Sequence, residues 1–318
     1  VTRTLVLICT LLLVACTQQT LETQNIAIDS NVTTSGVNQK QSTGTRNNTH
    51  SQTANVIQAI LATTDLSIGK QRVGFILISR LGDVMVPKVT VTSQALFESQ
   101  NLSQTVEAKF KLWPNINRGL YVTEIDFPKP GDWRLNMRIT WPDGTTKTSH
   151  LLLEIEEQSI APMVGTFAIR SITKTIHTTP NLTELTSGRL QDPDFYQITL
   201  ADALQNSRPT IVVFTSPAFC TGPFCGPQLE ILRDLKFKFM NQVDFIHVDY
   251  YQNPDLILGN LDKAIISKAA LEWSLPDTQW TFVIDDRGII THRYQGFVNS
   301  EELHQSLQET VGSSISLG

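Results

Sequence analysis

Two cysteines, Cys220 and Cys225, stand close together near the end of the chain and have the residue type and spacing for thiol chemistry. A thiolate attacks disulfides, and a second thiol nearby can capture the mixed disulfide that forms. Helical spacing begins directly after Cys225, and the unpaired N–H groups at a helix N-terminus lower the pKa of a thiol placed there. We therefore predict that Cys225 is the nucleophile and that Cys220 is its partner in a Cys-x4-Cys pair.

The same pair has a second interpretation, as a permanent disulfide that braces a non-catalytic binding module. A loop with Gly222 and Pro223 could bring the two Cα atoms within the ~4.4–6.8 Å that a disulfide requires, but the spacing does not show that it does. A disulfide that closes so short a loop restricts the unfolded chain little, so stabilisation alone is a modest benefit. Thiol–disulfide exchange is therefore favoured, with the binding module as the alternative.

Strands and helices are expected on both sides of the cysteines. A continuous β-branched run at 210–215 precedes them, and helical spacing follows at 227–235. Further patterns predict a strand at 243–249, a helix at 261–273, a hairpin at 280–294 and a closing helix at 301–311. This order of elements, with Cys225-Gly226-Pro227 at the helix start, resembles the thioredoxin fold over about residues 196–311. The resemblance implies an α/β thioredoxin-like domain like those of bacterial envelope lipoproteins.

The sequence departs from the thioredoxin family at two positions. The usual Cys-Gly-Pro-Cys pair would be completed where Gln228 stands, so the usual resolving position is empty. The family's cis-proline, before the strand that faces the cysteine loop, is matched here by Trp280. Because that proline normally shapes the substrate groove, we expect substrate handling to differ from that of ordinary thioredoxins.

Two other redox chemistries are less favoured by the same residues. Pro217, Thr221 and Cys225 are similar to the peroxiredoxin pattern but have one residue too many before the cysteine, and no arginine can be placed beside the thiolate. The copper-delivering Sco family would have a ligand histidine within the stretch 277–280, which contains none. We interpret His247 as a core residue and His292 as exposed, and predict neither a metal nor a cofactor.

The first sixteen residues resemble a bacterial lipoprotein signal. The apolar run from Leu5 to Val14 is too short to cross a membrane as a helix, and it ends in the lipobox-like sequence Leu13-Val14-Ala15-Cys16. The resemblance implies cleavage before Cys16 and lipid attachment to its thiol, and two acyl chains anchor a protein stably. We therefore expect membrane lipid as a partner, a location on the extracytoplasmic face of the cell membrane, and an envelope client that carries a thiol or a disulfide.

Strand signals fill residues 59–157. Apolar and polar residues alternate at 88–92, 119–127 and 133–139, with turn signals between them, and about seven antiparallel strands are predicted. Such a pattern is typical of an immunoglobulin-like β-sandwich. The stretch from Gly119 to Trp133 resembles YtkA-like and FixH-like extracytoplasmic domains, and we predict a scaffold or spacer without a metal site.

Composition completes the predicted division of the chain. Residues 16–58 are rich in Thr, Gln, Asn and Ser, which predicts a disordered tether, and residues 158–193 have little periodicity, which predicts a linker. The predicted order is signal peptide 1–15, tether 16–58, immunoglobulin-like sandwich 59–157, linker 158–193 and thioredoxin-like domain 194–318. The 318 residues include 25 Lys and Arg against 30 Asp and Glu, a net charge of −5 without a basic cluster, which argues against a nucleic-acid partner.

Overall fold

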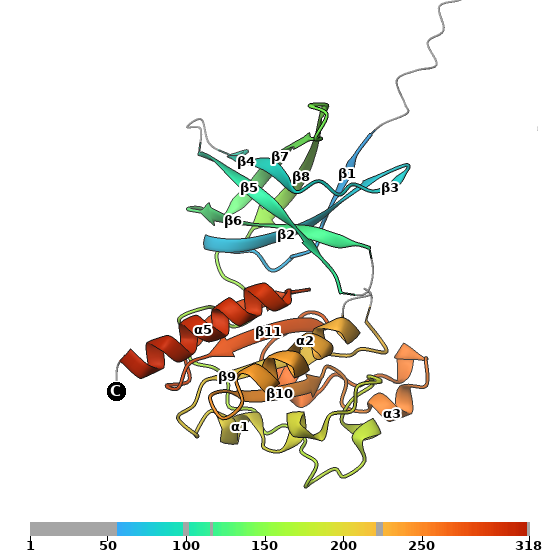
Figure 1. The fold of residues 1–318 in the computed structure, drawn as a ribbon, viewed down its shortest axis with the longest axis vertical. Coiled ribbons are helices and arrows are strands. Elements are labelled where there is room, and N and C mark those ends of the chain that lie inside the picture. The colour runs from blue at the N-terminus through green and yellow to red at the C-terminus, as the bar shows by residue number, and fades with distance from the viewer. Residues whose placement is uncertain (1–55, 98–101, 115–116, 221–224, 317–318) are drawn as a thin grey trace, which may run out of the picture. The chain divides into compact units, whose positions relative to one another are not determined.

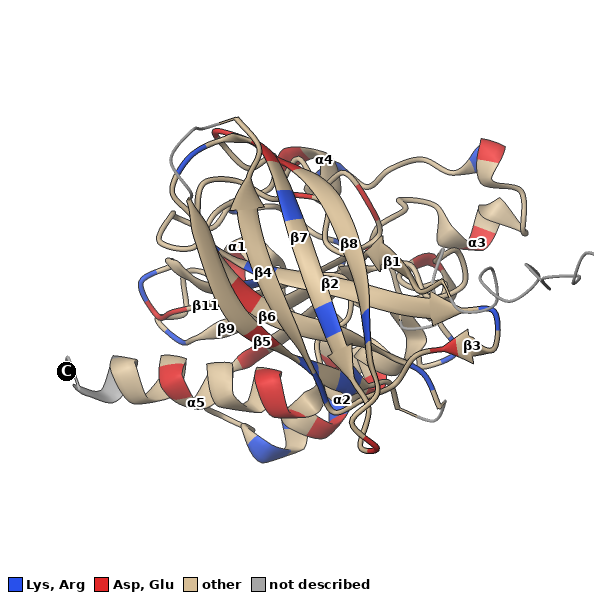
Figure 2. Cartoon of the chain, turned by 90° about the horizontal axis from the view of Figure 1, so that it is seen from above, with Lys and Arg blue, Asp and Glu red and all other residues tan. Residues whose placement is uncertain are grey.

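The computed structural model describes residues 56–97, 102–114, 117–220 and 225–316 (Figure 1). The predicted signal peptide, Cys16 and nearly all of the predicted tether lie outside these residues, so lipid anchoring stays a prediction. None of the helices in the described ranges is both long and apolar enough to cross a membrane. Over the same ranges, Lys and Arg are interspersed with Asp and Glu rather than gathered in a basic stripe (Figure 2).

The first half of the described chain forms an eight-stranded sheet in the order β1-β2-β6-β5-β4-β7-β8, with β3 paired to β2. Alternation along each strand directs one set of side chains inward; in β7, Trp133, Leu135, Met137 and Ile139 are buried while their neighbours are not. The strands are β1 (Gln58–Leu61), β2 (Gly69–Ser79), β3 (Gly82–Asp83), β4 (Lys88–Ala95), β5 (Ser103–Leu112), β6 (Gly119–Phe127), β7 (Gly131–Thr140) and β8 (Thr146–Ile155).

These strands form one curled sheet, and the predicted immunoglobulin-like sandwich is not confirmed. The two ends of the sheet meet, because the Ser149 hydroxyl donates to the Ile57 carbonyl over 2.8 Å and the Ile68 N–H donates to the Glu156 carbonyl over 3.0 Å. The sheet is therefore barrel-like. Alternation in the sequence shows which side chains each strand buries but not which strands pair, since a sandwich and a barrel both bury every second residue.

The second half contains a four-stranded sheet in the order β10-β9-β11-β12. Its strands are β9 (Thr210–Thr215), β10 (Asp244–Asp249), β11 (Gln279–Ile284) and β12 (Ile290–Gln295). β9 and β10 are parallel, β11 is antiparallel to β9, and β12 is antiparallel to β11. Every residue of β9, β10 and β11 is buried, as expected for strands covered on both faces. The antiparallel pair β11 and β12 is the hairpin predicted at 280–294.

Helices cover both faces of the four-stranded sheet (Figure 1). The helical elements are η1 (Leu182–Glu184), η2 (Pro193–Tyr196), α1 (Leu200–Ala203), α2 (Cys225–Lys238), α3 (Pro254–Ile257), η3 (Leu261–Lys263), α4 (Lys268–Glu272) and α5 (Ser300–Ser316). Leucines of α2 and α5 share one core cluster with Ile211 and Val213, whereas α1 and α4 pack with Val212 and Phe214 in another. The helix predicted at 261–273 is therefore two short elements, η3 and α4.

The predicted linker at 158–193 carries buried side chains. Ser171, Thr173 and Thr175 are each at most 8% exposed, and the backbone N–H of Ile176 donates to the Tyr196 carbonyl over 2.9 Å. Residues 50–318 belong to one compact unit, within which this segment packs on the four-stranded sheet. The division into separate domains stays a prediction.

Candidate functional site

Cys220 and Cys225 form a disulfide, with their Cα atoms 6.2 Å apart. Cys220 follows the end of β9, and Cys225 is the first residue of α2. The residues between them, 221–224, lie outside the described ranges. The two predicted site residues are thus joined by a disulfide at the start of α2, the helix that follows β9.

The two sulfur-bearing residues differ in exposure. Cys225 is 1% exposed, whereas Cys220 is half-buried. The Cys225 Sγ atom lies 3.6 Å from the carbonyl oxygen of Thr278, the residue directly before β11. Access from solvent is therefore greater at Cys220 than at Cys225, the residue predicted to be the nucleophile.

Gln228 occupies the position where the thioredoxin resemblance would place a second cysteine. Its side chain is fully buried, and its Oε1 atom accepts hydrogen bonds from the backbone N–H of Val298 (3.1 Å) and from Gln279 Nε2 (3.3 Å). The Thr215 hydroxyl in turn donates to Gln279 Oε1 over 3.2 Å. Gln228 therefore ties the first turn of α2 to β11 and to the segment before α5, a structural role that its sequence position alone does not reveal.

Trp280, at the position of the family's cis-proline, is fully buried and donates from Nε1 to Asp277 Oδ1 over 2.8 Å. The guanidinium of Arg293 lies 5.1 Å from the centre of its ring and pairs with Asp65 over 2.8 Å. Arg293 is thus held in an ion pair, which argues against the role that a peroxidase would give to an arginine beside the thiolate.

Of the two histidines interpreted from the sequence, His247 is buried as predicted and His292 is less exposed than predicted. His247 is 2% exposed, and its Nδ1 and Nε2 atoms lie 2.6 Å from the Tyr196 hydroxyl and 3.1 Å from the Thr215 carbonyl. Burial lowers the pKa of His247 to about 4, so the imidazole is neutral at pH 7. His292, predicted to be exposed, is instead half-buried, with its Nε2 atom 3.1 Å from a carboxylate oxygen of Glu309. Within the described ranges, no three His, Cys, Asp or Glu side chains gather as a metal site would require.

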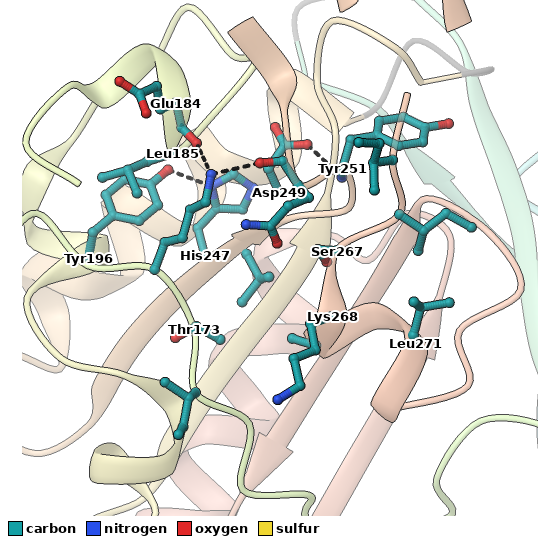
Figure 3. Close-up of a pocket in the computed structure, with 17 residues that line it drawn as sticks. Thr173, Glu184, Leu185, Tyr196, His247, Asp249, Tyr251, Ser267, Lys268 and Leu271 are labelled. Carbon is teal, nitrogen blue, oxygen red and sulfur yellow. Dashed lines mark hydrogen bonds between the residues drawn. The ribbon is translucent and has the colours of Figure 1, made fainter. Parts of the chain in front are cut away.

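A cavity of about 440 Å³ lies beside the carboxyl end of β10 and was not predicted (Figure 3). Its residues come from the segment 172–196, from β10 and from the stretch 251–271. Residues so scattered in sequence give no local motif. The lining consists of Ile172, Thr173, Lys174, Glu184, Leu185, Tyr196, His247, Val248, Asp249, Tyr251, Gln252, Ile265, Ile266, Ser267, Lys268, Ala269 and Leu271.

An aromatic contact connects the lining of the cavity to the segment that carries Cys220. The ring of Phe219, the residue before Cys220, lies 6.1 Å from the ring of Tyr251, which lines the cavity. Asp249, at the end of β10, accepts a hydrogen bond from Ser216, the residue after β9. Burial raises the pKa of Asp249, although hydrogen bonds from Ser216 and from backbone N–H groups oppose that rise.

No protein-family model matches the chain, and no curated protein matches it significantly. Solved structures similar to part of it include a candidate protein disulfide isomerase from Bacteroides thetaiotaomicron, with 13% identity over 49% of this chain and 94% of that one and a TM-score of 0.34. A thiol:disulfide interchange protein of the thioredoxin family from Chlorobium tepidum TLS has 12% identity over 46% of this chain and all of that one, with a TM-score of 0.30. A thioredoxin-like protein in the oxidised form has 14% identity over 33% of this chain and 79% of that one, with a TM-score of 0.27.

Scores this low describe partial likeness, so the assignment depends on topology. The strand order β10-β9-β11-β12, with the disulfide at the helix that follows β9, is the thioredoxin arrangement. The part of the chain that carries Cys220 and Cys225 therefore has a thioredoxin-like fold.

Proposed function

We propose that this protein exchanges its Cys220–Cys225 disulfide with the thiols of a client protein. The single observation that supports this function best is the position of the disulfide, with Cys225 as the first residue of the 14-residue helix α2. At a helix N-terminus the unpaired N–H groups and the helix dipole stabilise a thiolate. A disulfide that releases a stabilised thiolate is readily broken, because low-pKa thiols are good leaving groups.

The difference in burial suggests which sulfur meets the client. A client thiolate attacks Cys220 Sγ, the more exposed sulfur; a client–Cys220 disulfide forms, the Cys220–Cys225 bond breaks, and Cys225 departs as a thiolate. A second client thiolate then attacks the client sulfur of the mixed disulfide and releases Cys220 as a thiolate. The client dithiol is oxidised and the cysteine pair is reduced; the same steps in reverse reduce a client disulfide. In this assignment Cys220, rather than Cys225, is the sulfur that touches the client.

The setting of this activity follows from the N-terminal sequence, which supports a lipid-anchored protein of the bacterial cell envelope. Lipid on Cys16 would hold the domain at the extracytoplasmic face of the membrane, where disulfides persist. The alternative is a binding module whose disulfide is only a brace. The burial of Cys225, at 1% exposure, is the observation that favours this alternative, because buried cysteines are usually inert.

A redox titration of the full chain separates the two functions. The protein is equilibrated in glutathione and dithiothreitol series, its free thiols are trapped, and peptide mapping reads Cys220 and Cys225 separately from Cys9 and Cys16. We expect a reversible transition well above about −300 mV, the range of exchange-competent pairs. A pair that stays oxidised below that potential would contradict the proposal and identify a structural disulfide.

Single variants test which sulfur meets the client. Reduced Cys225→Ser protein retains Cys220, and we expect oxidised glutathione to modify it about tenfold faster than it modifies Cys225 in the matched Cys220→Ser protein. The measurement is the rate of mass increase of the peptide that contains the remaining thiol. Faster modification of the Cys220→Ser protein would instead restore Cys225 as the attacking residue.

A further inference from the structure

The cavity beside β10 has the size and lining of a small-molecule site. Its volume of about 440 Å³ falls within the range of about 300–1,000 Å³ that is usual for ligand pockets. Seven of the seventeen lining residues are aliphatic: Ile172, Leu185, Val248, Ile265, Ile266, Ala269 and Leu271. Neither of the described cysteines lines it, so a ligand in this cavity would bind whether or not the cysteines exchange with a client.

Tyr196 and His247 lie side by side at the cavity (Figure 3). If the His247 Nε2–H donates to the Thr215 carbonyl, its Nδ1 atom accepts the hydrogen bond of the Tyr196 hydroxyl, and both groups are satisfied. Because burial lowers the pKa of His247 to about 4, this imidazole carries no charge at pH 7. Tyr196 and His247 therefore neither attract nor repel a charged ligand strongly.

Lys174 supplies a positive charge at the wall. Its ammonium donates to the backbone carbonyls of Glu184 (3.1 Å) and Gln252 (2.6 Å), which fix its position. Among the residues that the structure describes, no carboxylate lies within ion-pair distance of it. An ammonium has three N–H donors, so one remains for a ligand. The charge-assisted hydrogen bond that this donor can make favours an anionic acceptor.

The two carboxylates that line the cavity do not cancel this preference. Asp249 is 5% exposed and already accepts hydrogen bonds from Ser216 and from the backbone N–H groups of Ser187 and Tyr251, and burial raises its pKa. The Glu184 side chain points away from Tyr196, His247 and Asp249 in Figure 3. Lys268 also lines the cavity, but its ammonium lies 3.4 Å from a carboxylate oxygen of Glu272 and its side chain is 76% exposed. Lys174, whose ammonium is fixed by two backbone carbonyls, is thus the cation that we assign to the ligand charge.

The mouth of the cavity is aliphatic. Ile172, Ile265 and Leu271 are 76%, 59% and 61% exposed, an unfavourable arrangement in water unless something covers them. A chain of methylene groups that runs from the mouth toward Lys174 would bury this surface at about 0.8 kcal/mol for each CH₂.

We propose that this cavity binds a small aliphatic carboxylate. Its carboxylate accepts the free N–H of Lys174, and its hydrocarbon chain lies along the aliphatic wall to the mouth at Ile265 and Leu271. The occupant is thus defined by one anionic head and one aliphatic chain.

Three ligands with the same chain test the choice of head group. Octanoate, octan-1-ol and octylammonium are titrated separately into the full chain, and binding is followed by isothermal titration calorimetry. We expect saturable one-to-one binding of octanoate, about tenfold tighter than that of octan-1-ol and tighter still than that of octylammonium. Equal affinities for octanoate and octan-1-ol, or binding of octanoate that does not saturate, would overturn the proposal.

Two pairs of variants place the site. Lys174→Met keeps the aliphatic stem, and we expect it to weaken octanoate binding about tenfold without changing octan-1-ol binding. The control Lys263→Met lies outside the cavity and should change the binding of neither ligand. Leu271→Asp at the mouth should weaken both ligands, whereas Leu258→Asp, 80% exposed and outside the lining, should not. Equal effects of Leu271→Asp and Leu258→Asp would place binding elsewhere. The ligand series on the unmodified chain decides the head group even where a variant fails to fold.

Discussion

Asp65 and Arg293 form a buried ion pair of 2.8 Å that joins the segment before β2 to β12. Their side chains are only 3% and 11% exposed. Burial alone would raise the pKa of Asp65, but hydrogen bonds from Ser159 and from the Ile160 N–H, together with the Arg293 charge, lower it below its usual value. The pair therefore holds the eight-stranded sheet to the four-stranded one and depends on the ionised carboxylate.

Asp65→Asn should destabilise the protein by about 3 kcal/mol, because it leaves the Arg293 charge buried without a partner. Urea denaturation at pH 7 measures this change. The control is Glu124→Gln, which removes the exposed ion pair with Lys70 and should leave the unfolding free energy nearly unchanged. Equal effects of the two variants would show that the buried pair contributes no more to the free energy of unfolding than the exposed pair does.

The pKa of Asp65 also sets a pH dependence. Because its folded-state pKa lies below the ordinary value of 3.8, its contribution is present above about pH 3.8 and is lost as the pH falls through the lower folded value. Unfolding curves of the unmodified protein and of Asp65→Asn should therefore converge below pH 3.8. Curves that stay equally far apart down to pH 2 would contradict this origin of the stability.

His247 should make the protein less stable in mild acid. Its pKa is about 4 in the folded protein against 6.5 in the unfolded chain, so the unfolded chain takes up the proton first as the pH falls. The loss begins near pH 6.5, continues to about pH 4 and amounts to about 3 kcal/mol. Urea denaturation between pH 7 and pH 4 measures it. His247→Gln should flatten this part of the profile, whereas the exposed control His150→Gln should not.

Replacement of Gln228 by methionine should lower the free energy of unfolding by about 1–3 kcal/mol, because the buried N–H of Val298 and the Nε2 of Gln279 lose their acceptor. Chemical denaturation provides the value, and Gln158→Met, at an exposed position, is the matched control. A Gln228→Met protein as stable as this control would show that water or another group replaces the amide.

Reduction of the disulfide should lower the unfolding free energy by about 2 kcal/mol, the chain-entropy value for so short a loop. Urea curves with and without dithiothreitol measure the difference, and the double variant Cys220→Ser, Cys225→Ser should not respond to the reductant. A loss of twice this size would favour the structural brace over thiol exchange.

Local patterns predicted the strands well and their partners poorly. The β-branched run at 210–215 coincides with β9, and the alternating stretches at 119–127 and 133–139 fall in β6 and β7. Pairing depends on contacts between residues far apart in the chain, which alternation does not encode, and for this reason a sandwich was expected where one curled sheet formed.

The candidate site was predicted in part for the same reason. The closeness of Cys220 and Cys225 in sequence made their pairing an open expectation, and the disulfide agrees with it. Their unequal burial could not be predicted, because it involves contacts with residues distant in the chain, such as that of Cys225 with Thr278, fifty-three residues further on. Lys174 stands in a stretch without periodicity that was expected to be a linker, so the cavity gave no signal in the sequence.

The meeting of β1 and β8 bears on how this protein avoids self-association. An open antiparallel sheet presents two rows of unpaired backbone N–H and C=O groups to which strands of other chains can add. Here each end of the sheet lies against the other, through Ser149 and Ile57 and through Glu156 and Ile68. Detachment of the four-residue β1 would leave the backbone groups of β2 that it pairs unpaired and would remove the chain that lies against β8, so this short strand helps to protect the sheet against aggregation.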